Sequence, residues 1–176
     1  YIADYEPNGE FSRCLPFDEY IVVRPENLRA NYIGSGKTSI VPELVKLSAE
    51  AGYSILYLPR YPSDRELAGG THGIYVPPQP VNGLDAVYFS RAVLSGAGTF
   101  AREAACLGKP AISFYAGSTL LAVDRRMINQ GWVYHSRDPY AILKYLRSTK
   151  ARPADIDRCR QVKKEVLNYL DNIIMN

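Results

Sequence analysis

The stretch with the clearest chemical potential is a glycine loop between an apolar run and a helix-forming run. The apolar run ends at Leu94, a helix is expected to open at Thr99, and between them lie Ser95, Gly96, Ala97 and Gly98. Such a loop brings bare backbone N–H groups to the positive end of a helix, which suits an anionic ligand such as a phosphate. Alternatively, a short turn needs glycines only for its backbone angles.

Glu103 lies four residues after Thr99 and therefore on the same face of the predicted helix. There its carboxylate would reach ligand hydroxyls just beyond a phosphate held at the helix end. The alternative is a solvated helix carboxylate that pairs with Lys109 or Arg102. The pattern thus predicts a hydroxyl contact next to a phosphate contact and leaves the solvated carboxylate open.

Arg24, Arg60 and Ser118 each follow an apolar run closely. In open α/β sheets the carboxyl ends of the strands meet at one edge, and ligands bind outside that edge. We therefore expect these three side chains to be supporting anion contacts on the same rim as the glycine loop. The alternative for Arg24 is a surface salt bridge with Glu26 or Asp18.

Short apolar runs alternate with helical patterns along the chain, and no hairpin signal separates them. This alternation predicts a Rossmann-like, three-layer α/β/α domain with a parallel sheet of about six strands. The expected strands are Tyr20–Val23, Tyr53–Leu58, Ile74–Val76, Ala92–Leu94, Pro110–Phe114 and Trp132–Tyr134.

Three parts are expected along the chain. Residues 1–19 form an irregular lead-in or linker, 20–150 the nucleotide-binding domain, and 151–176 a C-terminal amphipathic helix. Apolar residues recur in that helix at spacings of three and four, so it is expected to pack on the domain or on a missing N-terminal half. Because the chain starts at Tyr1 rather than Met, we expect a fragment.

Composition narrows the function classes. The net charge of +3 over 176 residues, with no basic run, disfavours nucleic acid as a partner. No apolar stretch is long enough for a membrane span. Three cysteines without metal-ligand spacing indicate free thiols in the cytoplasm, and two distant histidines disfavour a metal site or a hydrolase triad. We expect no metal and no bound cofactor other than a nucleotide ligand.

The run from Gly34 to Thr38, with sequence GSGKT, resembles the end of a P-loop. Asn31 stands where the motif requires its first glycine, and no apolar strand ends in an aspartate that would hold magnesium. We therefore predict a flexible loop before a helix and keep a P-loop nucleotide hydrolase as a distant alternative.

Several segments together resemble the family known as domain of unknown function 354. The resemblance lies in SGAGTFAREAACLGKPAISFY, LLAVDRRMINQGWVYHS, LPFDEYIVVRPE, VPELVKL and LPRYPSDRE. It covers nearly the whole chain and implies the C-terminal half of a protein about twice as long. That family is distantly similar to the GT-B glycosyltransferases and the UDP-N-acetylglucosamine 2-epimerases. These have two Rossmann-like domains, and the C-terminal one holds the nucleotide diphosphate.

The epimerase pattern has a serine-glycine-glycine loop, a pair of glutamates and a Leu-Gly-x-Pro turn. Residues 95–99 match the loop loosely, Glu103 matches the second glutamate, and Leu107–Pro110 match the turn. Arg102 replaces the first glutamate, and Arg60 lies where the epimerases carry a histidine, so the resemblance does not imply epimerase chemistry.

The resemblance implies a nucleotide-sugar-binding half of a GT-B-like enzyme with a UDP-sugar-like ligand. The glycine loop would bind the diphosphate, Glu103 the ribose hydroxyls, and Arg24 and Arg60 would offset phosphate charge. Catalytic groups would come partly from the missing half, so this chain alone is expected to bind without turnover. The alternative from another class is a non-catalytic ligand-sensing or assembly domain that kept the fold.

Overall fold

The computed structural model describes residues 2–31, 33–34 and 36–175. Its centre is a six-stranded sheet whose neighbouring strands are all parallel, in the order β3-β2-β1-β4-β5-β6. This confirms the predicted Rossmann-like α/β class. The strands are β1 (Ile21–Arg24), β2 (Ile55–Tyr57), β3 (Ile74–Tyr75), β4 (Ala92–Ser95), β5 (Ala111–Ser113) and β6 (Val133–His135).

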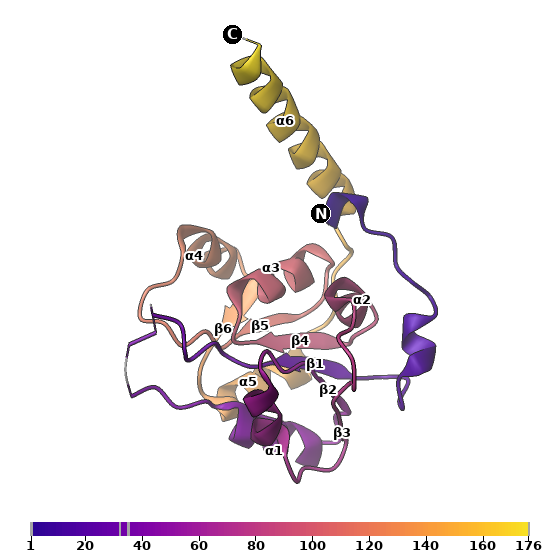
Figure 1. Cartoon of the computed structure of the whole chain (residues 1–176), viewed down its shortest axis with the longest axis vertical. Helices are drawn as coiled ribbons and strands as arrows, with labels where there is room; N and C mark the ends of the chain where they lie inside the picture. The colour runs from indigo at the N-terminus through magenta and orange to yellow at the C-terminus, as the bar shows by residue number, and fades with distance from the viewer. Residues whose placement is uncertain (1, 32, 35, 176) are drawn as a thin grey trace.

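Helices cover both faces of the sheet and give the fold three layers (Figure 1). α2, α3 and α4 lie on one face, and α1, α5 and the 3-10 helix η3 lie on the other. The helices are α1 (Val41–Glu50), α2 (Gly83–Tyr88), α3 (Gly98–Cys106), α4 (Ala122–Asn129), α5 (Pro139–Ser148) and α6 (Ile156–Ile174), with the 3-10 helices η1 (Ile2–Asp4), η2 (Phe11–Cys14) and η3 (Pro62–Ala68).

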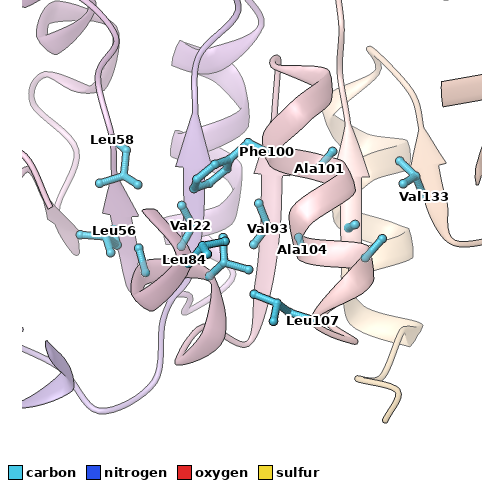
Figure 2. Packing of buried hydrophobic residues seen from close by; sticks show 14 of the residues in the cluster. Val22, Leu56, Leu58, Leu84, Val93, Phe100, Ala101, Ala104, Leu107 and Val133 are labelled. Carbon is cyan, nitrogen blue, oxygen red and sulfur yellow. The ribbon is translucent and has the colours of Figure 1, made fainter. Parts of the chain in front are cut away.

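The central strands are apolar throughout because both faces of the sheet are covered. In β1, Val22 packs in the cluster beneath α2 and α3, whereas Ile21 and Val23 pack in the cluster on the α1 and α5 side. Figure 2 shows the first of these clusters, in which Ala101 and Ala104 of α3 face the sheet. Small side chains at these two positions let α3 lie close to the strands.

The strand order reverses between β1 and β4, which are neighbours in the sheet but distant in sequence. Arg24 at the end of β1 lies in register with Ser95 at the end of β4. Chains that leave two such strands in opposite directions open a crevice at the carboxyl edge, and ligands bind there in open α/β sheets. The fold therefore brings Arg24 beside the glycine loop.

Helix α6 extends away from the domain (Figure 1). Its first turns contact η1: Arg160 Nε donates to the Ala3 carbonyl at 3.2 Å, and Lys163 forms a salt bridge with Asp4. Beyond these turns its apolar side chains are exposed, as with Val166 and Ile173. Among the described residues, no helix combines the length and the apolar character that a membrane span requires.

The end of α3 is joined to the start of α6. The Asp155 N–H donates to the Cys106 carbonyl at 3.3 Å. Gly108 has a φ of +72°, and a Cβ there would lie 2.2 Å from the Arg152 carbonyl oxygen. Both facts require glycine at this position, where the segment that leads to α6 crosses the end of α3.

All three cysteines are free thiols, but their environments differ. Cys14 is exposed, whereas burial and the neighbouring Cys159 thiol raise the pKa of Cys106 to about 11. Because the thiolate is the reactive form, we expect iodoacetamide to alkylate Cys106 on the order of 100-fold more slowly than Cys14 near neutral pH. Peptide mass spectrometry over a time course measures both rates. Similar rates in the folded protein would contradict this environment, whereas in urea the difference should vanish.

Candidate functional site

The first residues of the glycine loop are held by internal hydrogen bonds. The Ser95 hydroxyl accepts the Ala97 N–H at 2.9 Å and donates to the Ala97 carbonyl at 3.1 Å. The Gly96 N–H donates to the Arg24 carbonyl at 2.9 Å. A Cβ on Gly96 would lie 2.5 Å from both N and Cα of Glu26. Ser95 and Gly96 thus fix the shape of the loop in this structure.

The later residues of the loop open α3. The helix begins at Gly98 with Ala97 at its N-cap, and no side chain caps it. The first N–H groups of a helix have no intrahelical partner, and the helix dipole places partial positive charge there. Together with the exposed Thr99, this uncapped end has the properties of an anion-binding position.

A hollow of about 300 Å³ lies beside this helix end. It brings together five of the residues that the sequence singled out, from three different elements of the chain. A second hollow of about 400 Å³, walled by prolines, shares Arg24, Arg60 and Gly83 with it. The first hollow is lined by Arg24, Arg60, Gly83, Ala97, Thr99, Phe100 and Glu103.

Two arginines line this hollow, and neither forms a salt bridge among the described residues. The Arg24 guanidinium lies 5.2 Å from the centre of the Phe100 ring, and burial together with the charge of Arg60 lowers its pKa. The Nε of Arg60 is buried and has no hydrogen-bond partner in the part of the chain that the structure describes. Two half-buried like charges repel each other, so an anion between them would relieve the repulsion.

Glu103 lies one turn into α3. Burial raises the pKa of its carboxyl group, and the charges of Arg24 and Arg102 oppose this rise. In the described part of the chain Glu103 forms no salt bridge, because Arg102 binds Asp124 and the Lys109 ammonium lies over the Tyr88 ring. Its carboxylate therefore has acceptor capacity for ligand hydroxyls.

Ser118 is not part of this arrangement. It is exposed on the loop between β5 and α4 and lines neither hollow. Lys37 and Thr38 precede α1, which begins only after Ser39 and Ile40, whereas a P-loop leads directly into its helix. Ser35 of the same run lies outside the described residues.

Sequence reasoning missed a buried ionic cluster behind the glycine loop. The expected alternative pairing of Arg24 with Glu26 is wrong, because Glu26 binds Arg137 at 3.0 Å and accepts the Ser39 hydroxyl at 2.7 Å. Arg137 also donates to the Thr38 carbonyl at 2.8 Å. This cluster fixes the backbone of Glu26, on which Gly96 packs. No local pattern in the sequence predicts a contact across 111 positions.

A curated relative resembles this chain in sequence, and several solved structures resemble it in fold. The uncharacterised protein MJ0665 of Methanocaldococcus jannaschii is 28% identical over 141 residues, which cover 77% of this chain and 41% of that protein. The structure of UDP-GlcNAc 2-epimerase from the same organism matches with a TM-score of 0.64 at 13% identity, over 90% of this chain and 48% of that one. The calicheamicin glycosyltransferase CalG4 matches with a TM-score of 0.55 at 18% identity, over 93% of this chain and 40% of that one.

The chain thus spans less than half the length of these matched proteins. Another structure of the M. jannaschii epimerase, in complex with UDP-GlcNAc and UDP, matches with a TM-score of 0.62 at 13% identity, over 96% of this chain and 50% of that one. The family model described as protein of unknown function (DUF354) matches residues 8–173. The chain therefore belongs to the DUF354 family, and its domain has the fold found in UDP-GlcNAc 2-epimerases and GT-B glycosyltransferases.

Proposed function

We propose that this chain is the nucleotide-sugar-binding half of a GT-B-like protein and that it holds a UDP-sugar-like ligand. The observation that carries the proposal is that one hollow brings together two arginines, an uncapped helix end and the Glu103 carboxylate, which forms no salt bridge among the described residues. This hollow lies at the carboxyl edge, beside the reversal of strand order. Each of these groups on its own has an ordinary structural explanation. Together they fit a nucleoside diphosphate, because the helix end and the arginines suit its phosphates and the carboxylate suits its ribose hydroxyls.

The ligand would lie along α3. Its diphosphate takes the uncapped N-terminus at Ala97 to Thr99, where Arg24 and Arg60 offset its charge. The ribose hydroxyls donate to Glu103, one turn further along the helix. Ser95 and Gly96 support the site by holding the loop in shape. Ser118 belongs to the site only if the rest of the protein brings the loop after β5 toward the ligand.

Catalysis would depend on groups outside this chain. Arg60 and Arg102 stand where the related epimerases carry a histidine and a glutamate, so the residues present favour binding over epimerase chemistry. The exposed apolar face of α6, which includes Val166, Leu170 and Ile173, is the surface on which an N-terminal half would pack. A non-catalytic sensing role is the second candidate, and the substituted histidine and glutamate favour it. A turnover assay on the full-length protein separates the two.

Thermal unfolding in the presence of ligands tests the proposal. UDP at a hundred times its dissociation constant should add about 2.7 kcal/mol of stability, a rise in Tm of about 5–10 °C for a domain of this size. UDP-GlcNAc, other nucleoside diphosphates and ATP, measured in parallel, identify the base and the sugar. Glu103→Ala should remove most of the shift caused by UDP, because the ribose then loses its acceptor.

The matched control is Glu43→Ala, which removes an exposed carboxylate from the first turn of α1 on the other face of the sheet. This variant should keep the full shift. If none of the nucleotides shifts Tm, with this chain or with the full-length protein, the nucleotide-sugar proposal is wrong and the sensing or assembly role takes its place.

A further inference from the structure

An ion pair lies against the N-terminus of α3. Arg102 Nη1 binds Asp124 Oδ1, and both side chains are mostly buried, with 24% and 17% of their surface exposed. Arg102 Nη2 also donates to the Thr99 hydroxyl at 3.1 Å. Asp124 belongs to the first turn of α4, so the pair joins the middle of α3 to the start of α4.

The Asp124 carboxylate stands where negative charge is most favourable. A Cβ on Gly98, the first residue of α3, would lie 3.2 Å from Asp124 Oδ2 and 3.0 Å from Arg102 Nη1. The carboxylate is therefore adjacent to the uncapped helix end, and among the described residues it accepts its hydrogen bond from Arg102 and not from the helix N–H groups. It supplies the anion that the helix dipole favours and leaves the first N–H groups of α3 unoccupied.

A phosphate at Thr99 would meet this carboxylate at close range. The two groups carry like charges beside the same helix end, in a partly buried setting where screening by water is weak. Arg102 is the shared counter-ion, because it already donates to the Thr99 hydroxyl and its guanidinium has five N–H donors. A guanidinium that already reaches Thr99 would bind a phosphate held there by turning away from the carboxylate.

We infer that Asp124 is a built-in competitor for the ligand phosphate and that binding transfers Arg102 from Asp124 to the phosphate. Arg102 is thereby a further phosphate contact, and Asp124 sets the affinity and discriminates against weakly charged anions. This inference rests on the proposed binding of a diphosphate at α3. It gives a role to Arg102, which the resemblance to the epimerases left without one.

The experiment measures dissociation constants by isothermal titration calorimetry for inorganic pyrophosphate and for UDP. Asp124→Asn removes the competing charge, so both ligands should bind more tightly, on the order of tenfold. Arg102→Met should weaken both ligands by a similar factor. The control Asp157→Asn, at an exposed carboxylate on α6, makes the same change in net charge and should leave both constants unchanged.

A merely structural role for the pair predicts the opposite sign. If Asp124 only orients Arg102, Asp124→Asn weakens the binding of both ligands, and that result overturns the inference. Dissociation constants for Asp124→Asn that equal those of the control Asp157→Asn overturn it as well. Asp124→Ser serves as a second variant should the amide disturb folding. Failure of both ligands to bind either the parent or Asp124→Asn also overturns the inference.

Pyrophosphate separates this inference from the proposed function. Tighter pyrophosphate binding by Asp124→Asn, with no UDP binding by any variant, supports the competitor and refutes the nucleotide ligand. Conversely, Glu103→Ala should weaken UDP without weakening pyrophosphate, because it removes the acceptor for the ribose hydroxyls and no phosphate contact.

Discussion

Gly96→Ala is expected to destabilise the protein by about 3 kcal/mol, near the upper end for overpacking a buried site. The new methyl group would lie 2.5 Å from the backbone N and Cα of Glu26. This backbone cannot retreat easily, because the Glu26 side chain is buried and binds Arg137, Ser39 and the Ile40 N–H. Urea denaturation followed by circular dichroism measures the loss as a lower midpoint at an unchanged m-value.

Gly9→Ala is the matched control for this prediction. A Cβ on Gly9 meets no atom within 4 Å, and the residue has no positive φ. The change should alter the free energy of unfolding by about 0.5 kcal/mol or less. A Gly96→Ala protein that unfolds at the same urea concentration as the control would show that the glycine loop does not rest on Glu26 as the structure has it.

Arg60→Gln is expected to change stability and binding in opposite directions. Without ligand, the substitution removes the charge that lowers the pKa of Arg24, so Tm should rise. With UDP, it removes a charge that would offset the diphosphate, so affinity should fall by about 10- to 100-fold. Scanning calorimetry and titration calorimetry on one preparation measure both effects.

Arg91→Gln provides the comparison. Arg91 is exposed at the amino-terminal end of β4, and its guanidinium lies over the Tyr53 ring, far from the carboxyl edge. This variant loses the same charge and should keep the affinity for UDP. If Arg60→Gln lowered Tm and left UDP binding intact, Arg60 would be a structural residue and the site would lose one of its two cations.

The sheet could be predicted because the strands are short apolar runs, and residues that cannot continue a strand follow some of them, as Pro25 follows β1. Parallel pairing then places all carboxyl ends at one edge, which predicts that Arg24, Arg60 and the glycine loop share that edge. They also come close because β1 lies between β2 and β4 in the sheet, whereas Ser118 follows β5 and lies outside the hollow. Their meeting in one hollow confirms the placement, while their part in binding stays a prediction.

Two ionic contacts could not be predicted, because they depend on side chains that reach across loops. Arg137 binds Glu26, which lies 111 positions away in the sequence. Arg102 of α3 binds Asp124, which lies in the first turn of α4. The wrong pairing of Arg24 with Glu26 has a similar cause. The chain leaves the strand after Arg24, so the alternation of a strand no longer holds at Glu26, which turns to Arg137 while Arg24 lies over Phe100.

The junction of α3 with α6 connects the last helix to the helix that borders the hollow. One end of α3 borders the hollow, and its other end holds the start of α6 through the Cys106 carbonyl and Asp155. With 19 residues, α6 is about 28 Å long. A rotation of about 10° at its base moves its far end by about 5 Å, simply from that length. A spin label near Ile174 would therefore register a rotation of the base of α6, if ligand binding at the hollow produced one through α3.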